Sequence, residues 1–295
     1  MTRATSAEKH ALRHGATMAE LMDDYVADME AHKLNGKALS TKKADRSRVE
    51  KHLKPKLGKI RVTAITPLQI EQFMNGCTPG SAKRLMQLLG AILSFGIKKG
   101  LRSDNPCKGI VKPKDVHKTR RLSLTEYQQL GTLLNDSPTV PNDVFMFLAL
   151  SGWRSSEARL LRYSELDLER CTATLGETKT GVSVRPLSSA AIDIIKKQSG
   201  DGEYVFAHQG KPFQNIHPHW YKLKMPEDVT QHTLRHSFAS LAADLGFSDH
   251  VIAGMLGHVR TSVTSRYLHL EAALIKAADA VAAETLRLMQ TSPVL

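Results

Sequence analysis

One stretch of the chain, residues 231–270, constrains both the fold and the chemistry more than any other. It concentrates cationic, imidazole and phenolic side chains, namely His232, Arg235, His236, His258, Arg266, Tyr267 and His269. Helix-starting and helix-ending residues divide this stretch into three short helices. They run from about Thr230 to Gly246, from an N-cap at Ser248 to Gly257, and from an N-cap at Thr261 through Tyr267. The stretch therefore predicts a polar site on a helical framework.

The first of these helices has an apolar face and a cationic face. The apolar stripe, at spacings of three and four, consists of Leu234, Phe238, Leu241, Ala242 and Leu245. His232 and Arg235 are three residues apart and share another face. A guanidinium binds a phosphate through two parallel hydrogen bonds, and an imidazole beside it can move a proton near neutral pH. This pair is therefore suited to binding and reacting with an anion.

The net charge points to a polyanion as partner. The formal net charge is +12, which indicates nucleic acid as the first candidate for a binding partner. The alternative is that the chain is an ordinary basic enzyme. Residues 81–121 hold eleven Lys or Arg against Asp104 and Asp115, so this segment alone carries +9. Such an uneven distribution favours a localised binding surface over a generally basic protein.

Composition limits the class of protein and its compartment. With 295 residues, 41% hydrophobic and 24% charged, the chain has the size of two globular domains. No run of about 18 apolar residues could span a membrane, and the N-terminus lacks the apolar core of a signal peptide. Cys77, Cys107 and Cys171 are scattered and odd in number, so they form no disulfide framework and favour a cytoplasmic setting.

The N-terminal part reads as a four-helix DNA-binding domain over residues 17–110, after a flexible N-terminus at 1–16. Its first helix starts near Thr17, and its second runs from Ser40 to His52, where Pro55 and Gly58 are expected to end it. The third runs from Thr66 to Phe73, and the fourth starts after Thr78. Residues 111–122 form a basic linker, suited to lie along a phosphate backbone. The candidate DNA contacts are Lys42, Lys43, Arg46, Lys83, Arg84, Lys112, Lys114, Lys118 and Arg120. Basic residues on helix faces can also be merely solvated.

The second domain, residues 123–270, reads as a helical domain with a small antiparallel β-sheet. A buried helix over 144–150 is broken at 151–154, and a new helix starts near Ser155, which places Arg154 at a helix N-terminus. The alternative is a surface arginine paired with Glu157. Three β-like pieces cover 165–168, 171–175 and 183–187, and the last two form a hairpin whose tip holds Lys179; a helix follows over 190–197.

Five motifs in this order resemble the tyrosine recombinase or phage integrase family over nearly the whole chain. The segment ALSGWRSSEARLLRYSELDLE resembles that family's first arginine box, and TKTGVSVRPLS its lysine hairpin. HTLRHSFAS, LGH and TSRYLHL resemble the second box, the next histidine motif and the nucleophile motif. The resemblance places catalytic roles on Arg154, Lys179, His232, Arg235, His258 and Tyr267. It implies a mainly α fold with a small antiparallel sheet, and His236 and Glu157 are expected to support the site.

The resemblance implies a site-specific recombinase or integrase that acts through a 3′-phosphotyrosyl bond and a Holliday junction. No cofactor and no metal are expected. The partners are double-stranded recombination sites and further copies of the chain, as a homotetramer on DNA and largely a monomer in solution. Accessory DNA-bending proteins are further candidate partners. The expected location is the cytoplasm of a bacterium or phage-infected cell, at the nucleoid.

The chain departs from the family's pattern at three points. Trp153 stands where a smaller aliphatic residue is more usual, and Thr233 stands where Asp is more common. Neither change removes a reacting group. An arm-binding domain is not evident ahead of residue 17, so the layout is closer to Xer recombinases. The C-terminal helix, within residues 271–295, either folds back onto its own domain or docks on a neighbouring protomer.

The residues also allow three other interpretations: a zinc site, a DNA-binding regulator and a topoisomerase. His232 and His236, with His217 and His219, could hold zinc, although Thr233 replaces the glutamate of the metalloprotease pattern. Residues 248–270 could be the helix-turn-helix of a non-enzymatic regulator. A type IB topoisomerase would share the recombinase chemistry. A covalent DNA adduct separates the enzymes from the regulator, and a recombined product separates recombinase from topoisomerase.

Overall fold

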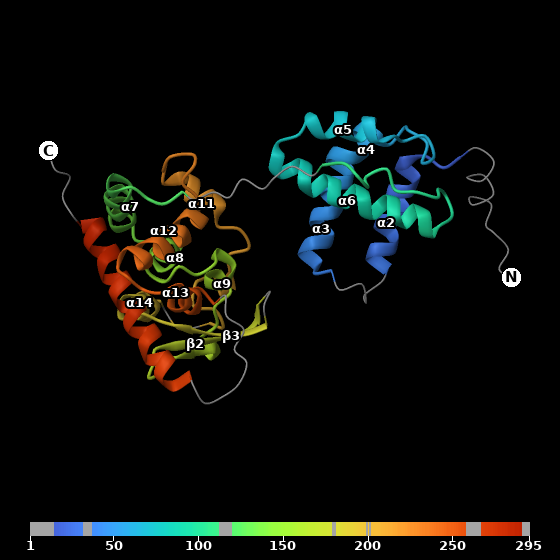
Figure 1. Cartoon of the computed structure of the whole chain (residues 1–295). Coiled ribbons are helices and arrows are strands. Elements are labelled where there is room, and N and C mark those ends of the chain that lie inside the picture. Colours follow the sequence, from blue (N-terminus) through green and yellow to red (C-terminus); the bar gives the residue numbers. More distant parts are fainter. Residues whose placement is uncertain are drawn as a thin grey trace. The chain divides into compact units, whose positions relative to one another are not determined.

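Helices dominate the chain and a small antiparallel sheet accompanies them, as the sequence predicted (Figure 1). The computed structural model describes residues 15–31, 37–111, 120–178, 181–198, 200, 202–257 and 267–290. Residues 177, 178, 181 and 267–270 are described by their backbone alone. The chain divides into two compact units, an N-terminal unit (Met1–Lys118) and a C-terminal unit (Thr119–Leu295). No helix in the described ranges is long and apolar enough to cross a membrane.

The N-terminal unit is built from helices whose apolar stripes face one another. These are α2 (Met18–Ala31), α3 (Leu39–Arg48), the π-helical turn η1 (Val49–Leu53), α4 (Lys54–Leu57), α5 (Pro67–Asn75) and α6 (Pro79–Lys98). Thr66 caps α5 through a reciprocal pair of hydrogen bonds with Gln69. In the core, α6 packs against α2 so closely that a Cβ atom at Gly96 would lie 2.9 Å from Leu21 Cδ2.

The second helix of this unit extends further than predicted. Pro55 does not end it, because α3, η1 and α4 follow one another without a break from Leu39 to Leu57. A proline has no N–H to donate, and its ring clashes with the preceding turn of a regular α-helix. The wider π-helical turn just before Pro55 accommodates it. The helix ends at Gly58, as predicted.

In the C-terminal unit the buried helix is α8 (Val140–Ser151), other helices pack around it, and a small sheet lies beside them. Its helices are α7 (Leu124–Asp136), α8 (Val140–Ser151), α9 (Ser155–Arg159), the 3-10 turn η2 (Tyr163–Glu165), α10 (Ser189–Lys196), α11 (His217–Lys222), α12 (Gln231–Asp244), α13 (Asp249–Leu256) and α14 (Tyr267–Gln290). Its strands are β1 (Leu166–Asp167), β2 (Thr172–Thr178), β3 (Gly181–Pro186), β4 (Ala207–His208) and β5 (Lys211–Pro212). The helix α7, the helix α11 and the β4–β5 hairpin were not predicted.

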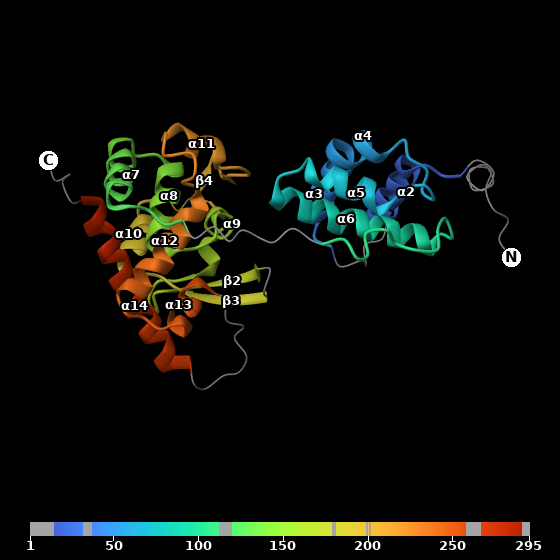
Figure 2. The same ribbon diagram turned by 45° about the horizontal axis from the view of Figure 1, so that its top comes forward.

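The first sheet positions the hairpin that the sequence predicted. Its strands run in the order β1-β2-β3, all antiparallel, with Thr174 opposite Val184 (Figure 2). α13 and α14 pack against β3. Lys179, at the predicted hairpin tip, lies outside the described residues.

The helices α12 and α13 have the bounds that their capping residues predicted. Thr230 and Ser248 are the N-caps, and Gly246 and Gly257 adopt the left-handed conformation, with φ of 83° and 66°. The apolar stripe of α12 is shorter than predicted, because Leu245 at its end is exposed. The third helix expected from Thr261 falls within 258–266, outside the described residues.

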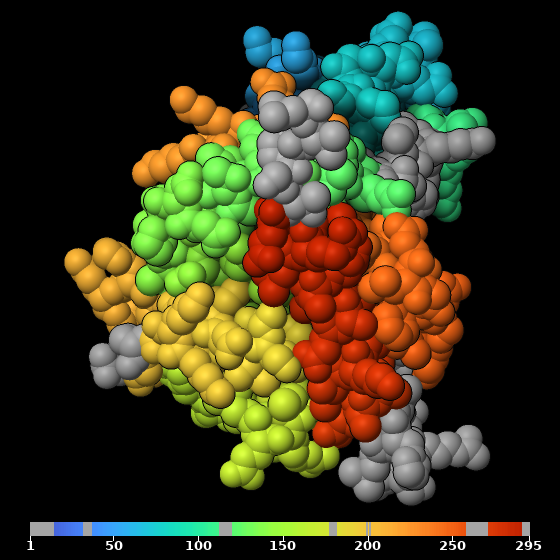
Figure 3. Space-filling model, turned by 90° about the vertical axis from the view of Figure 1, so that its left-hand side faces the viewer, coloured from blue at the N-terminus to red at the C-terminus, as the bar shows by residue number. Residues whose placement is uncertain are grey.

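The last helix packs in cis. α14 begins at Tyr267, earlier than the predicted start at residue 271, and packs against α7, α8 and α13 of its own unit. Figure 3 shows α14, in red, running along the unit between green and yellow segments on one side and orange segments on the other. Its buried face consists of Ala277, Ala278, Val281, Ala282, Thr285 and Met289. The apolar stripe of residues 271–290 is therefore covered by its own unit in this chain, and docking of the C-terminal segment on a neighbouring protomer stays a prediction.

Candidate active site

The break after α8 presents Arg154. Gly152 ends α8 in the left-handed conformation, with φ of 64°, and a Cβ atom there would lie 2.6 Å from Cδ1 of Phe238. Trp153 is then buried, and Arg154 becomes the N-cap residue of α9. The sequence of Ser151 to Arg154 therefore turns the chain sharply and leaves Arg154 at the edge of the core, as predicted.

Arg154 is held by a buried carboxylate. Glu157 Oε1 accepts a hydrogen bond from Arg154 Nη1 at 2.7 Å, and Glu157 Oε2 accepts one from the Arg154 backbone N–H at 2.9 Å. The Glu157 side chain is only 8% exposed, whereas that of Arg154 is 33% exposed. Arg154 does pair with Glu157, as the alternative of a surface arginine predicted. The pair does not lie on the open surface, however, because the Glu157 side chain is buried. It fixes a partly exposed guanidinium beside the core.

Arg235 connects three elements of the unit. Its side chain is buried, and its Nη1 and Nη2 atoms donate to the carbonyl oxygens of Gly152 at 2.7 Å and Leu256 at 3.0 Å. The break after α8 and the end of α13 are therefore tied to α12. Burial lowers the pKa of Arg235 to about 10, and the positive charge of Arg154 contributes to the shift. The group remains protonated at neutral pH.

His232 is exposed one turn before Arg235, and its ring lies against His236, with the ring centroids 4.6 Å apart. Desolvation by the surrounding protein lowers the pKa of His232, and the positive groups of His236, Arg235 and Arg154 lower it further. His232 is therefore neutral at pH 7 and able to accept a proton. Arg235 reaches the Gly152 carbonyl, two residues before Arg154, and His232 lies one turn away on the same helix, so the three side chains belong to one region of the unit.

A third arginine, Arg185 on β3, belongs to the cluster and was not predicted. It is fully buried, and its Nη2 atom donates to Glu157 Oε1 at 2.9 Å. The sequence pattern hides this residue, because the strand faces the opposite way from its hydrophobicity: Val182 and Val184 are exposed, whereas Ser183 and Arg185 are buried. A strand read by hydrophobicity would have its valines inside.

Of the three other predicted catalytic residues, one begins a described segment and two directly follow one in the sequence. Lys179 and His258 are outside the described residues. Tyr267 is the first residue of α14, and its side chain is not described. α13 ends at Gly257 beside Arg185, so the backbone just before His258 lies at the cluster, whereas Lys179 directly follows the end of β2.

The candidate DNA contacts of the N-terminal unit lie on α3 and α6. Arg84 lines a hollow of about 300 Å³ together with Arg48 and His52, at the N-terminus of α6. Arg46 forms an ion pair with Glu30 at 2.7 Å. Lys42, Lys43 and Lys83 also belong to these two helices. The hollow joins positive side chains to a helix N-terminus, an arrangement suited to a phosphate.

Arg120, at the other end of the predicted basic linker, is engaged by carboxylates. It pairs with Glu126 and, at 2.6 Å, with Asp228. These hydrogen bonds raise the pKa of Arg120, and Arg120 in turn lowers the pKa of Glu126. A DNA phosphate would have to displace both carboxylates to bind Arg120, so this residue is a weaker candidate. Lys112, Lys114 and Lys118 lie outside the described residues.

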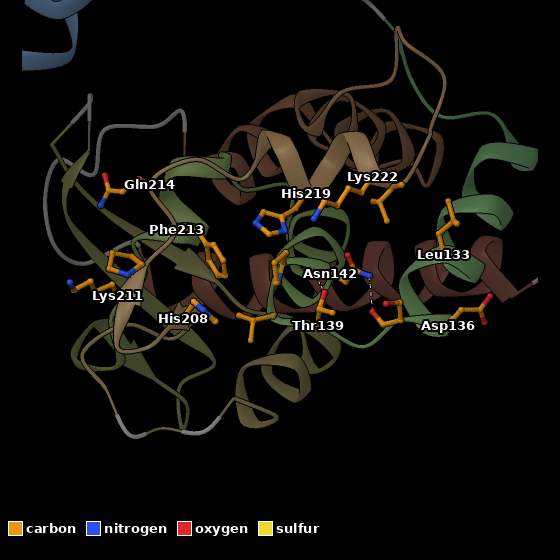
Figure 4. A pocket seen from close by; sticks show the side chains of 15 residues that line it. Leu133, Asp136, Thr139, Asn142, His208, Lys211, Phe213, Gln214, His219 and Lys222 are labelled. Atoms are coloured by element: carbon orange, nitrogen blue, oxygen red, sulfur yellow. Dashed lines mark hydrogen bonds between the residues drawn. The ribbon is translucent and has the colours of Figure 1, made fainter.

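A separate hollow of about 820 Å³ lies between the α7–α8 connection, the β4–β5 hairpin and α11 (Figure 4). His208, Phe213 and His219 face it, and none of Arg154, His232 and Arg235 lines it. The zinc alternative required His219 beside His232 and His236. His219 lies on α11 and lines this hollow, whereas His232 and His236 lie together on α12 and do not line it. Within the described ranges no group of three histidines, cysteines or carboxylates could hold a metal ion.

Comparisons with known proteins match both units. Residues 120–273 match the model of the phage integrase family, and residues 18–112 match that of the phage integrase central domain. The tyrosine recombinase XerD of Lacticaseibacillus casei is 30% identical over 217 residues, covering 65% of this chain and 73% of that protein. A tyrosine recombinase of Thermosipho africanus is 26% identical over 277 residues, 85% of this chain and 94% of that protein. A lambda integrase tetramer bound to a Holliday junction has a similar fold, with a TM-score of 0.70, 17% identity, and coverage of 90% of this chain and 85% of that one.

Proposed function

Because the chain belongs to the phage integrase family of tyrosine recombinases, we propose that it cuts and rejoins DNA at specific sites with the cluster of Arg154, His232 and Arg235. The cluster itself carries the proposal, since it combines two guanidinium groups with a neutral imidazole. Guanidinium groups bind the oxygens of a phosphate, and a neutral imidazole accepts a proton. Tyr267 opens α14 within the predicted nucleophile motif.

The proposed reaction is a transfer of the phosphate between two oxygens. The Tyr267 hydroxyl attacks a DNA phosphorus and gives its proton to His232, while the bond from phosphorus to the 5′ oxygen breaks. Lys179 protonates that leaving oxygen, so the products are a 3′-phosphotyrosyl bond and a 5′-hydroxyl. Arg154 and Arg235 stabilise the charge on the non-bridging oxygens, and His258 donates a hydrogen bond to them.

Rejoining reverses these steps on a second DNA. The 5′-hydroxyl of the partner strand attacks the phosphotyrosyl phosphorus, and Tyr267 leaves with a proton. Exchange of one pair of strands produces a Holliday junction, and exchange of the other pair resolves it. The phosphotyrosyl bond retains the energy of the phosphodiester, so the reaction is balanced without ATP.

Apart from the cluster itself, the DNA is proposed to contact basic residues of the N-terminal unit and of the linker. In the N-terminal unit these are Lys42, Lys43, Arg46, Lys83 and Arg84, and in the linker Lys112, Lys114 and Lys118. The hollow beside Arg84 supports a phosphate contact there. Four active sites are needed for two duplexes, so we propose a homotetramer on paired sites and a largely monomeric protein in solution. A lambda integrase has been solved as such a tetramer on a Holliday junction.

The test of this function is covalent capture. The wild-type protein is incubated with nicked DNA that carries its recombination site, and the products are separated on a denaturing gel. We expect a protein–DNA adduct, and we expect none for Tyr267→Phe, which still binds the DNA. An adduct that persists in Tyr267→Phe would assign the nucleophile to another residue, such as Tyr163 or Tyr221.

The same assay separates the alternative functions. A helix-turn-helix regulator would bind DNA without an adduct, and a topoisomerase would relax supercoiled DNA without a recombined product. Because arginine, lysine and histidine supply the positive charge in the proposed mechanism, cleavage should persist in excess EDTA. Loss of cleavage in EDTA with rescue by zinc would instead support the metal site.

A further inference from the structure

We propose that Arg185 is a positioning residue that neutralises Glu157 and so leaves the charge of Arg154 available to the DNA phosphate. This inference rests on the proposed function, in which Arg154 binds that phosphate. It concerns a side chain that lies behind the site and does not itself meet DNA, since Arg185 is 0% exposed.

Arg185 is held on every side by described groups. Its Nε atom donates to Ser183 Oγ at 3.1 Å, and its Nη1 atom donates to the carbonyl oxygen of Met255 at 3.4 Å. The guanidinium lies over the ring of Trp153, with Cζ 5.7 Å from the ring centroid. A Cβ atom at Gly257 would overlap the guanidinium, so a larger residue there would displace Arg185. The position of Arg185 is therefore fixed.

One carboxylate oxygen joins Arg185 to Arg154. Glu157 Oε1 accepts from Arg154 Nη1 at 2.7 Å and from Arg185 Nη2 at 2.9 Å. The three side chains together carry a charge of +1. Without Arg185, the buried carboxylate and Arg154 would form a pair without net charge. A phosphate would then meet a weaker positive potential at Arg154, because charges near a protein core are poorly screened.

Stability alone does not account for Arg185. Burial lowers its pKa, an effect that Glu157 partly offsets, and a guanidinium stays protonated in either case. Burying a charge is unfavourable, and an apolar side chain of similar size often replaces a buried ion pair without loss of stability. Trp153 and Met255, both buried beside Arg185, already provide apolar surroundings. What an apolar side chain cannot supply is the positive charge against Glu157.

The test uses three variants and a single-turnover cleavage assay, with DNA affinity and thermal unfolding measured in parallel. Arg185→Met keeps an unbranched stem but removes the charge, and we expect the cleavage rate to fall about tenfold or more while DNA affinity changes less than about twofold. Arg185→Lys keeps the charge, and we expect cleavage within about threefold of wild type.

The double variant Arg185→Met with Glu157→Gln decides the matter. It removes the carboxylate that would otherwise neutralise Arg154, so we expect faster cleavage than in Arg185→Met alone. If the double variant is no faster, or if folded Arg185→Lys is as slow as Arg185→Met, the proposal is wrong. If Arg185→Met does not fold, the double variant is compared directly with wild type, and a rate more than about tenfold lower overturns the proposal.

Failure of this inference differs from failure of the proposed function. If wild-type protein forms no adduct with DNA, the recombinase chemistry itself is wrong. If wild type forms the adduct and Arg185→Met forms it equally fast, only the role of Arg185 is wrong.

Discussion

Single residues decide how closely the buried arginines approach the backbone. Gly152 and Gly257 both adopt a left-handed conformation, and both lie where a Cβ atom would collide with a neighbour. The Gly152 carbonyl accepts from Arg235, whereas Gly257 packs directly on Arg185. The two glycines therefore do more than end helices, because Gly152 also makes room for the Phe238 ring and Gly257 for the Arg185 guanidinium.

The collision at Gly257 can be separated from its backbone conformation. Gly246 also has a positive φ, of 83°, but no atom lies within 4 Å of a Cβ there. We expect Gly246→Ala to lower the free energy of unfolding by about 1 kcal/mol. Gly257→Ala should cost about 1–3 kcal/mol more, because it also displaces Arg185. Denaturant unfolding measures both, and equal losses would contradict the packing argument.

The lowered pKa of His232 predicts the acid side of the pH–rate profile. Its base form is required to accept the tyrosine proton, and it persists below the ordinary histidine value of 6.5. Cleavage should therefore decline only as pH falls below about 6.5. His236→Gln removes an electrostatic effect that lowers the pKa of His232, so the decline should move to higher pH.

His250→Gln is the matched control for this experiment, because His250 is exposed on α13. It should leave the pH–rate profile unchanged. A decline that stays in place, or moves to lower pH, in His236→Gln would show that the charge of His236 does not act on His232.

At the scale of elements, α14 completes the core of the C-terminal unit. Gly254 on α13 lets the two helices approach closely, since a Cβ atom there would lie 2.8 Å from Leu274 Cδ2 of α14. Arg170, in the turn after β1, binds both carboxylate oxygens of Glu271 at 3.2 and 3.0 Å. This pair fixes the helix one turn after Tyr267. The placement of the proposed nucleophile therefore depends on how α14 packs.

Two adjacent alanines test whether α14 packs in cis. Ala282 is buried and Ala283 is exposed. Ala282→Asp places a carboxylate in the core and should lower the free energy of unfolding by several kcal/mol, on the order of 3 or more. Ala283→Asp should change it by less than about 1 kcal/mol. Thermal unfolding of the monomer measures both, and equal effects would mean that the helix leaves its own unit.

At the scale of the whole molecule, some of the 41 Lys and Arg residues are committed to internal ion pairs. Arg120 binds Glu126 and Asp228, and Arg121 binds Asp244 at 2.6 Å. These two arginines attach the start of the C-terminal unit to α7 and α12. A count of basic residues therefore overstates the charge that can meet DNA.

The salt dependence of DNA affinity distinguishes free from committed charges. Each phosphate contact contributes about 0.9 to the slope of log affinity against log salt concentration. We expect Arg84→Gln to reduce the slope by about that amount, and Lys112, Lys114 and Lys118 changed together to glutamine to reduce it further. Arg120→Gln should reduce the slope less than Arg84→Gln and should also lower the unfolding temperature. A larger reduction for Arg120→Gln would show that DNA displaces its carboxylate partners.

The sequence by itself determined the features that depend on near neighbours. Caps and glycines gave the bounds of α12 and α13, periodic apolar residues gave α2 and α6, and the order of motifs indicated the family that the comparisons confirmed. These signals are readable because a capping bond or a helical stripe joins residues three or four positions apart.

Only the tertiary structure decided which charges meet. Arg185 and Met255 are 70 residues apart, Arg235 and Gly152 are 83 apart, and Arg120 and Asp228 are 108 apart. The tertiary structure also decided what covers the apolar face of α14, because its apolar pattern would fit either its own core or that of a neighbour. No local pattern specifies such partners, because the packing of distant segments selects which groups lose water together and must then bind one another.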